Sequence, residues 1–278
     1  SANTSGQKNT AVGRAALQSI TSQDNNTAVG YNALSSGSNT GSDNTAIGMD
    51  ALTGNTSGSR NTAVGTSAGE AVTTAEDNTF VGRQAGKATT TGNSNTGMGK
   101  DALLSNTTGA ENVAIGRASM EQNTTGSYNT AVGGYGTLDA NTTANNNTAI
   151  GAGVLTVNTT GGNNTSVGAY SLDANTTGAE NVAVGYASLS SNTTASQNVA
   201  VGPESLQDNT TGSYNTGIGT GSLKEQTTGS ANTGLGYWSL RENTTASNNT
   251  AVGSYALFAN TTGSENQALG TYTLATCT

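Results

Sequence analysis

The chain has 278 residues, a formal net charge of −8 and no histidine, and only 32% of its residues are hydrophobic, 4% aromatic and 9% charged. This composition excludes a conventional globular core of such length, and an acidic balance without a Lys/Arg cluster argues against a nucleic-acid partner. No run of about 18 apolar residues is present, so we expect no membrane insertion, and the missing histidine removes His-based triads, proton shuttles and zinc sites.

A short motif recurs along the whole chain. Its closing glycines are 17 residues apart in thirteen of fifteen intervals and 18 apart in the other two. A disordered low-complexity chain shares the composition but has no reason to keep phase over sixteen units. The closing glycines are Gly13, Gly30, Gly48, Gly65, Gly82, Gly99, Gly116, Gly133, Gly151, Gly168, Gly185, Gly202, Gly219, Gly236, Gly253 and Gly270.

Each 17-residue repeat begins with a segment like Asn-Thr-Ala-Val-Gly, which we predict to be a strand. Its residues alternate and are rich in β-branched side chains, so Thr and Val should share one face and Ala the other. The glycine should close the strand at a corner that needs positive φ or close backbone approach. The segments are 9–13, 26–30, 44–48, 61–65, 78–82, 95–99, 112–116, 129–133, 147–151, 164–168, 181–185, 198–202, 215–219, 232–236, 249–253 and 266–270.

Two further segments complete the repeat. In twelve repeats a Leu stands four residues after the glycine, as at Leu34 and Leu103, usually after Ala or Ser. We predict a second short extended segment there and expect this Leu to be buried with the Val of the strand. The following NTT or NTS, as at Asn106, should form another corner, because Asn and Gly tolerate left-handed conformations. Phe80 is an exception in the small-residue position before the Val.

The period of 17 predicts one coil of a parallel β-solenoid, or β-roll. It is too short for a propeller blade or a two-helix repeat, and the leucine-rich template is absent. Sixteen such coils would place equivalent residues on one another at about 4.8 Å. The Asn of the strand motif would then form a side-chain amide ladder. Its members include Asn9, Asn26, Asn44, Asn61, Asn112, Asn129, Asn181, Asn198 and Asn249.

The repeat runs from residue 1 to 278 as a single array, and we expect it to be a piece of a longer fibre protein. A row of Ala, Gly and Ser on one strand face favours close approach of another chain. We therefore expect a side-by-side homotrimer. The alternative is a monomeric solenoid whose small residues let two thin sheets touch. The extra residues of the two longer intervals, after Leu34 and after Gly133, fall in expected turns.

Several of these units resemble known repeats. NTAIG at 44–48, NVAIG at 112–116 and NVAVG at 181–185 are similar to the head repeats of trimeric autotransporter adhesins. NTAVGYNAL at 26–34 resembles repeats of phage and bacterial tail-fibre-like proteins. The resemblance implies a parallel β-roll assembled as a homotrimer on a cell or virion surface. The period is longer than that of the autotransporter heads and no heptad stalk is present, which favours the tail-fibre comparison.

These patterns predict a structural fibre or adhesin component that is extracellular, at a cell surface or on a virion. The alternatives are an ice-binding solenoid, a subunit that stacks end to end into an extracellular filament, and a polysaccharide-processing spike. We expect no enzyme activity, no cofactor and no metal site, because acidic residues sit singly and match no calcium-loop pattern. Surface glycans or a protein receptor are the expected external partners, with Tyr237 and Trp238 as the candidate contact.

Two features of the sequence admit chemical modification. The NTT and NTS segments match the N-glycosylation motif at, among others, Asn106, Asn123, Asn158 and Asn192. The repeat already accounts for them, so glycosylation is the minor interpretation. The single cysteine, Cys277, cannot build a disulfide framework or a zinc cluster. We expect it to be inconsequential, with an interchain bridge as the alternative.

Overall fold

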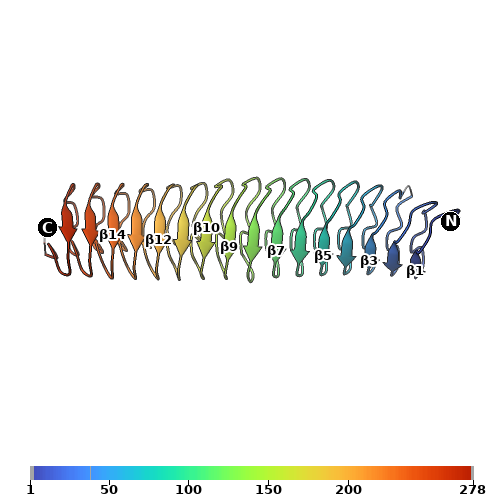
Figure 1. Ribbon diagram of the computed structural model, residues 1–278, viewed down its shortest axis with the longest axis horizontal. Helices are drawn as coiled ribbons and strands as arrows, with labels where there is room; N and C mark the ends of the chain where they lie inside the picture. The colour runs from blue at the N-terminus through green and yellow to red at the C-terminus, as the bar shows by residue number, and fades with distance from the viewer. Residues whose placement is uncertain (1–2, 38, 277–278) are drawn as a thin grey trace. The chain divides into compact units, whose positions relative to one another are not determined.

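The computed structural model describes residues 3–37 and 39–276, so Cys277 lies outside the described residues. The chain forms two compact units. The first comprises Ser1–Tyr135 and Asp139–Ala144, and the second comprises Gly136–Leu138 and Asn145–Thr278. Each unit is built from successive coils that carry one short strand apiece (Figure 1).

Every strand spans the three residues before a closing glycine. In the first unit the strands are β1 (Thr10–Val12), β2 (Thr27–Val29), β3 (Thr45–Ile47), β4 (Thr62–Val64), β5 (Thr79–Val81), β6 (Thr96–Met98), β7 (Val113–Ile115) and β8 (Thr130–Val132). In the second unit they are β9 (Thr148–Ile150), β10 (Thr165–Val167), β11 (Val182–Val184), β12 (Val199–Val201), β13 (Thr216–Ile218), β14 (Thr233–Leu235), β15 (Thr250–Val252) and β16 (Gln267–Leu269).

Neighbouring strands of each unit pair in parallel and in register. Thr45 of β3 lies opposite Thr62 of β4, and Ile47 lies opposite Val64. Pairing follows chain order from β1 to β8 in the first unit and from β9 to β16 in the second. The prediction of an all-β parallel β-solenoid is thereby confirmed, with about sixteen coils and no helix among the described residues.

The strand alternates as expected, but the buried side chain is the small one. Ala63 is completely buried, whereas its neighbours Thr62 and Val64 are half-buried on the outer face. The interior of the coil is filled by this Ala, by the Leu after the glycine, as at Leu103, and by Asn side chains. The expectation that Val and Leu are buried together is therefore wrong, because the pleat sends Val to the same side as Thr.

The row of small residues also lies inside the coil and not between chains. Ala46, Ala63 and Ala114 have no exposed surface within a single chain. Their small size is explained by the thin interior of the coil, which leaves no room for a larger side chain beside Leu. This packing is the one that the monomeric alternative requires, so the row of small residues no longer argues for a trimer.

Most of the coil outside the strand consists of turns. The predicted second extended segment is wrong: Leu52 and Leu103 adopt φ of 51° and 54°, in the left-handed region, within a continuous turn. A second left-handed residue lies two positions after every closing glycine except Gly133, and a third just before the strand-motif Asn, as at Asp50 and Asp43. The NTT segments do bend, as predicted for a corner, but their Asn is not among the left-handed residues, so the predicted reason for the corner is wrong.

The closing glycine is required by conformation and by space. Gly48 has φ of 136°, which an L-residue with a side chain rarely adopts. A Cβ at Gly48 would lie 2.5 Å from the carbonyl oxygen of Gly65 in the next coil. The backbones of successive coils therefore approach one another directly at this corner. The extra residue Gly134, in contrast, has open space where a Cβ would be.

Candidate functional surfaces

The strand-motif Asn forms a hydrogen-bonded ladder inside each unit. The Oδ1 of Asn44 accepts a hydrogen bond from the backbone N–H of Asn61 at 2.9 Å. The Nδ2 of Asn44 donates to the carbonyl oxygen of Gly58 at 2.9 Å. One side chain thus satisfies a backbone donor and a backbone acceptor of the following coil, both of which are buried.

The same pattern recurs through both units. The structure brings Asn9, Asn26, Asn44, Asn61, Asn112 and Asn129 into the ladder of the first unit, and Asn181, Asn198 and Asn249 into that of the second. Asn112 shows the pattern fully, since its Oδ1 accepts from the N–H of Asn129 and its Nδ2 donates to the carbonyl of Gly126 at 2.8 Å. These residues hold coils together and are completely buried from Asn26 onward to Asn249.

A second Asn ladder, which the sequence interpretation missed, runs through the NTT segments. Asn123 donates through Nδ2 to Oδ1 of Asn106 at 2.8 Å and to the carbonyl of Gly126 at 3.0 Å. In the second unit Asn243 donates to Oε1 of Gln226 at 2.9 Å. The signal that could have revealed this ladder is its recurrence about every 17 residues, although Val72 and Thr89 interrupt it in the first unit and the longer amide Gln226 replaces Asn in the second.

Burial in this ladder bears on glycosylation. The motif residues Asn106, Asn123, Asn158 and Asn192 have no exposed surface. Their Nδ2 atoms, which a glycan would occupy, donate to the carbonyl three residues on. The folded coil therefore presents none of these four side chains to a glycosylating enzyme.

The Thr that follows the second ladder adds a third set of contacts between coils. The Oγ1 of Thr56 donates to the carbonyl of Thr73, and that of Thr73 donates to the carbonyl of Thr90, each at 3.0 Å. The next residue of NTT, as at Thr108, is exposed. Adjacent Thr residues of NTT thus face different ways, as expected, and only one of each pair is available at the surface.

The outer face of the strands carries a regular Thr-x-Val pattern. Thr and an aliphatic residue stand two apart on twelve of the sixteen strands, whereas Val replaces Thr on β7, β11 and β12 and Gln replaces it on β16, and equivalent positions lie side by side on neighbouring strands. The aliphatic column is partly exposed: Met98 keeps 41% of its surface accessible and Ile115 keeps 38%. Each unit therefore presents a strand face with a hydroxyl column beside an aliphatic column, and the hydroxyl column is interrupted where Val or Gln replaces Thr.

Charged groups lie singly or in small surface clusters. Arg60 pairs with Glu76 and, at 2.6 Å between Nε and Oδ1, with Asp77. That hydrogen bond from Arg60 holds the pKa of Asp77 below its ordinary value. Within residues 3–37 and 39–276 no three acidic or cysteine side chains gather as a metal site would require.

Two carboxylates are unusual because they are partly buried. Burial raises the pKa of the Asp173 carboxyl above its ordinary value, while backbone hydrogen bonds oppose that rise. Burial likewise raises the pKa of Asp139, opposed by a hydrogen bond with Gln122. One oxygen of each carboxylate is buried without a hydrogen-bond partner. Both are costs to the folded state at neutral pH. Burial and then the charge of Asp139 also raise the pKa of Glu121.

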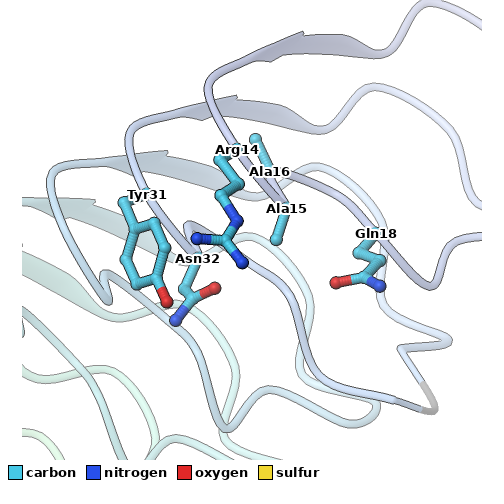
Figure 2. Close-up of a pocket in the computed structure, with 6 residues that line it drawn as sticks. All are labelled: Arg14, Ala15, Ala16, Gln18, Tyr31 and Asn32. Carbon is cyan, nitrogen blue, oxygen red and sulfur yellow. The ribbon is translucent and has the colours of Figure 1, made fainter.

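The five residues after each closing glycine form a surface that we call the turn face. At the beginning of the first unit it bears an open, polar hollow lined by Arg14, Ala15, Ala16, Gln18, Tyr31 and Asn32 (Figure 2). Figure 2 shows the guanidinium of Arg14 turned toward the ring of Tyr31, with Asn32 below it, and the guanidinium carbon lies 5.7 Å from the ring centre. The same pairing recurs between Arg117 and Tyr135 at 5.4 Å.

The turn face of the second unit holds the candidate pair Tyr237 and Trp238. Their rings stack with centroids 4.7 Å apart and planes at 16°. Tyr255, one coil further, lies 5.5 Å from both rings in edge-to-face geometry. Stacked on Tyr255 at 4.8 Å is Tyr272. The sequence pointed to the pair, whereas the ring contacts across three coils appear only in the structure.

Comparison with protein-family models and with curated proteins finds no match for the chain. Among the described residues there is no helix that is both long enough and apolar enough to cross a bilayer.

Proposed function

We propose that the chain is a structural component of an extracellular fibre, at a cell surface or on a virion, where it acts as a rigid spacer without enzymatic activity. The observation that carries the proposal is the continuous set of hydrogen bonds from each coil to the next within each unit. The strand, the two Asn ladders and the Thr column all contribute. Such a stack resists bending, because bending would strain all four sets together.

We expect the fibre to be a side-by-side homotrimer. The outer face of the strands supports this expectation, whereas the row of small residues no longer does. The aliphatic column that includes Met98 and Ile115 leaves a continuous row of partly exposed apolar side chains along the strand face of an isolated stack. Association of three chains along this face would cover the column in every coil. The resemblance to trimeric adhesin heads and tail fibres points the same way.

Mass measurement by light scattering tests the trimer. We expect three chain masses for the natural protein and one for Met98→Asp/Ile115→Asp, because paired charges on the outer face oppose its burial. Thr108→Asp, exposed on another side of the coil, is the matched control and should stay trimeric. A single chain mass for the natural protein at every concentration contradicts the trimer.

Electron microscopy tests the fibre itself. Elongated particles are expected, and particles that lengthen with concentration would indicate the end-to-end stacking alternative. Compact isolated particles at all concentrations would refute the fibre proposal.

Ice binding remains the second candidate because of a specific observation. The Thr-x-Val face repeats at the strand spacing, about 4.8 Å, and a regular array of hydroxyl groups is the kind of surface that can order water. Its Thr residues lie side by side on neighbouring strands, as Thr45 and Thr62 do. A thermal hysteresis measurement decides: a gap between melting and freezing supports ice binding, and none at high protein concentration removes it.

A further inference from the structure

A cluster of rings on the turn face of the second unit has no counterpart elsewhere in the described chain. All its rings are linked by centroid distances of 6.1 Å or less, and a guanidinium lies over two of them. We call it the aromatic patch. Its members are Tyr237, Trp238, Arg241, Tyr255, Phe258 and Tyr272.

The rings occupy positions where a bulky residue is unfavourable. Trp238, Tyr255 and Tyr272 all stand two residues after a closing glycine, with φ of 53°, 56° and 58°. Gly153 and Gly221 fill the same position in other coils of this unit, at little conformational cost. A turn that served only the fold would not need three successive rings in the left-handed region. The left-handed conformation itself recurs in nearly all coils, so the distinguishing feature of these three coils is the ring that each carries.

The patch is also fixed before any ligand arrives. A Cβ on Gly221 would lie 2.5 Å from Cδ1 of Trp238 and 2.7 Å from its Nε1, so the indole covers this glycine closely. The guanidinium carbon of Arg241 lies 5.0 Å from the Trp238 ring centre and 5.7 Å from that of Phe258. Rings held this way lose little freedom on binding.

Exposure and polar groups define what the patch can bind. Tyr237 keeps 43% of its surface accessible and Tyr272 keeps 63%, so both side chains can contact a ligand from solvent. Beside them, Arg241 pairs with Glu225 at 3.0 Å and with Glu242 at 3.5 Å. Apolar ring faces next to carboxylates and a guanidinium match a pyranose ring, whose C–H face stacks on an aromatic ring while its hydroxyls need donors and acceptors.

The charged side chains beside the aromatic patch indicate which class of saccharide it can bind. The local ion pairs include two carboxylates for one guanidinium, and the chain as a whole is acidic. An acidic saccharide would be repelled, whereas a neutral one would not. We propose that the aromatic patch is a binding site for neutral hexopyranose oligosaccharides. This names the ligand of the adhesive role and rests on the proposed fibre function.

The chain contains one tryptophan, which makes the patch directly observable. Tryptophan emission of the natural protein is titrated with neutral hexose oligosaccharides and, separately, with uronic-acid oligomers of equal length. We expect a saturable change in emission with a neutral oligosaccharide and at least tenfold weaker binding of the acidic one. Emission unchanged by every neutral oligosaccharide overturns the proposal, as does tighter binding of the acidic oligomers.

Variants separate binding from packing. Tyr255→Asn removes the central ring but keeps Trp238, and Asn is the residue at the equivalent left-handed position Asn32. We expect about tenfold weaker binding. Tyr170→Asn, at the same position in the same unit but paired with Tyr186, is the matched control and should bind normally. Equal weakening in both variants overturns the proposal.

Electron microscopy of Tyr255→Asn tests the fibre proposal separately. Particles of this variant should have the same shape as those of the natural protein. Elongated particles without saccharide binding would overturn only the patch assignment. Compact particles that still bind saccharide would overturn only the fibre.

Discussion

Phe80 replaces the small residue of β5, and its neighbourhood suggests a sharp test of how the coils pack. Its side chain is completely buried. The preceding coil carries Gly69 and its own coil carries Gly86 where most coils carry Leu. A Cβ on Gly69 would lie 3.1 Å from Cδ2 of Phe80, and one on Gly86 would overlap its Cε1. One large ring therefore fills the space that two leucines vacate.

Phe80→Ala should destabilise the first unit by about 3–5 kcal/mol, near the top of that range, because glycines on both sides cannot fill the cavity. Gly86→Leu should destabilise by at least about 1–3 kcal/mol through overpacking. The variant Phe80→Ala/Gly69→Leu/Gly86→Leu restores the ordinary repeat. Leu is conformationally acceptable there, since Leu52 adopts φ of 51° and Gly69 adopts 57°.

Urea unfolding followed by circular dichroism measures all three variants against the natural protein. The triple variant should recover most of the stability lost in Phe80→Ala, which gives a large favourable coupling between neighbouring sites. The reasoning would be refuted if the triple variant were no more stable than Phe80→Ala, or if Gly86→Leu alone were neutral.

Three other outcomes are expected. Asn112→Ala should cost about 2–4 kcal/mol in urea unfolding, because the buried N–H of Asn129 loses its acceptor; a cost no larger than that of the exposed control Thr108→Ala would contradict the ladder. Asp173→Asn should raise the thermal midpoint near neutral pH, because burial raises the pKa of this carboxyl. A raised pKa means that the carboxyl's contribution to stability is complete at acid pH and is lost as pH rises through the folded-state pKa, so the gain should vanish on acidification; an equal gain at both pH values would be inconsistent with that cause. Arg60→Gln should leave the thermal midpoint almost unchanged, because its ion pairs are solvent-exposed; a shift of many degrees would show that this surface cluster matters more than its exposure suggests.

The coil and the strand-motif Asn ladder could both be predicted from the sequence, and the reasons are physical. Strict repetition with β-branched residues before a glycine leaves few structures other than stacked strands. The Asn before Thr never varies, so its role between coils could be inferred from position alone. The predicted alternation of side chains between the two faces of the strand was also correct: Ala63 lies on the opposite face from Thr62 and Val64.

The second Asn ladder, the left-handed Leu residues and the extent of the aromatic patch could not be predicted. They depend on which side chains are buried, and residue type alone does not reveal that. Asn106 and Asn123 were interpreted as turn formers because Asn favours turns, yet inside the thin coil their amides donate to buried backbone carbonyls, and that of Asn123 also donates to Asn106. Leu103 adopts a left-handed conformation that its propensity disfavours, because burial outweighs local strain. The saccharide candidate could be guessed from Tyr237 and Trp238, but not its extension to Tyr255 and Tyr272.

Methyl and amide nuclear Overhauser contacts measure the stacking of coils most directly. In a selectively labelled sample, the methyls of Val64 should show cross-peaks to those of Val81, and the side-chain amide of Asn61 to Asn44, residues that are 17 apart in sequence. Cross-peaks confined to residues close in sequence, or helical amide-to-amide connectivities through these segments, would contradict a chain wound into stacked coils.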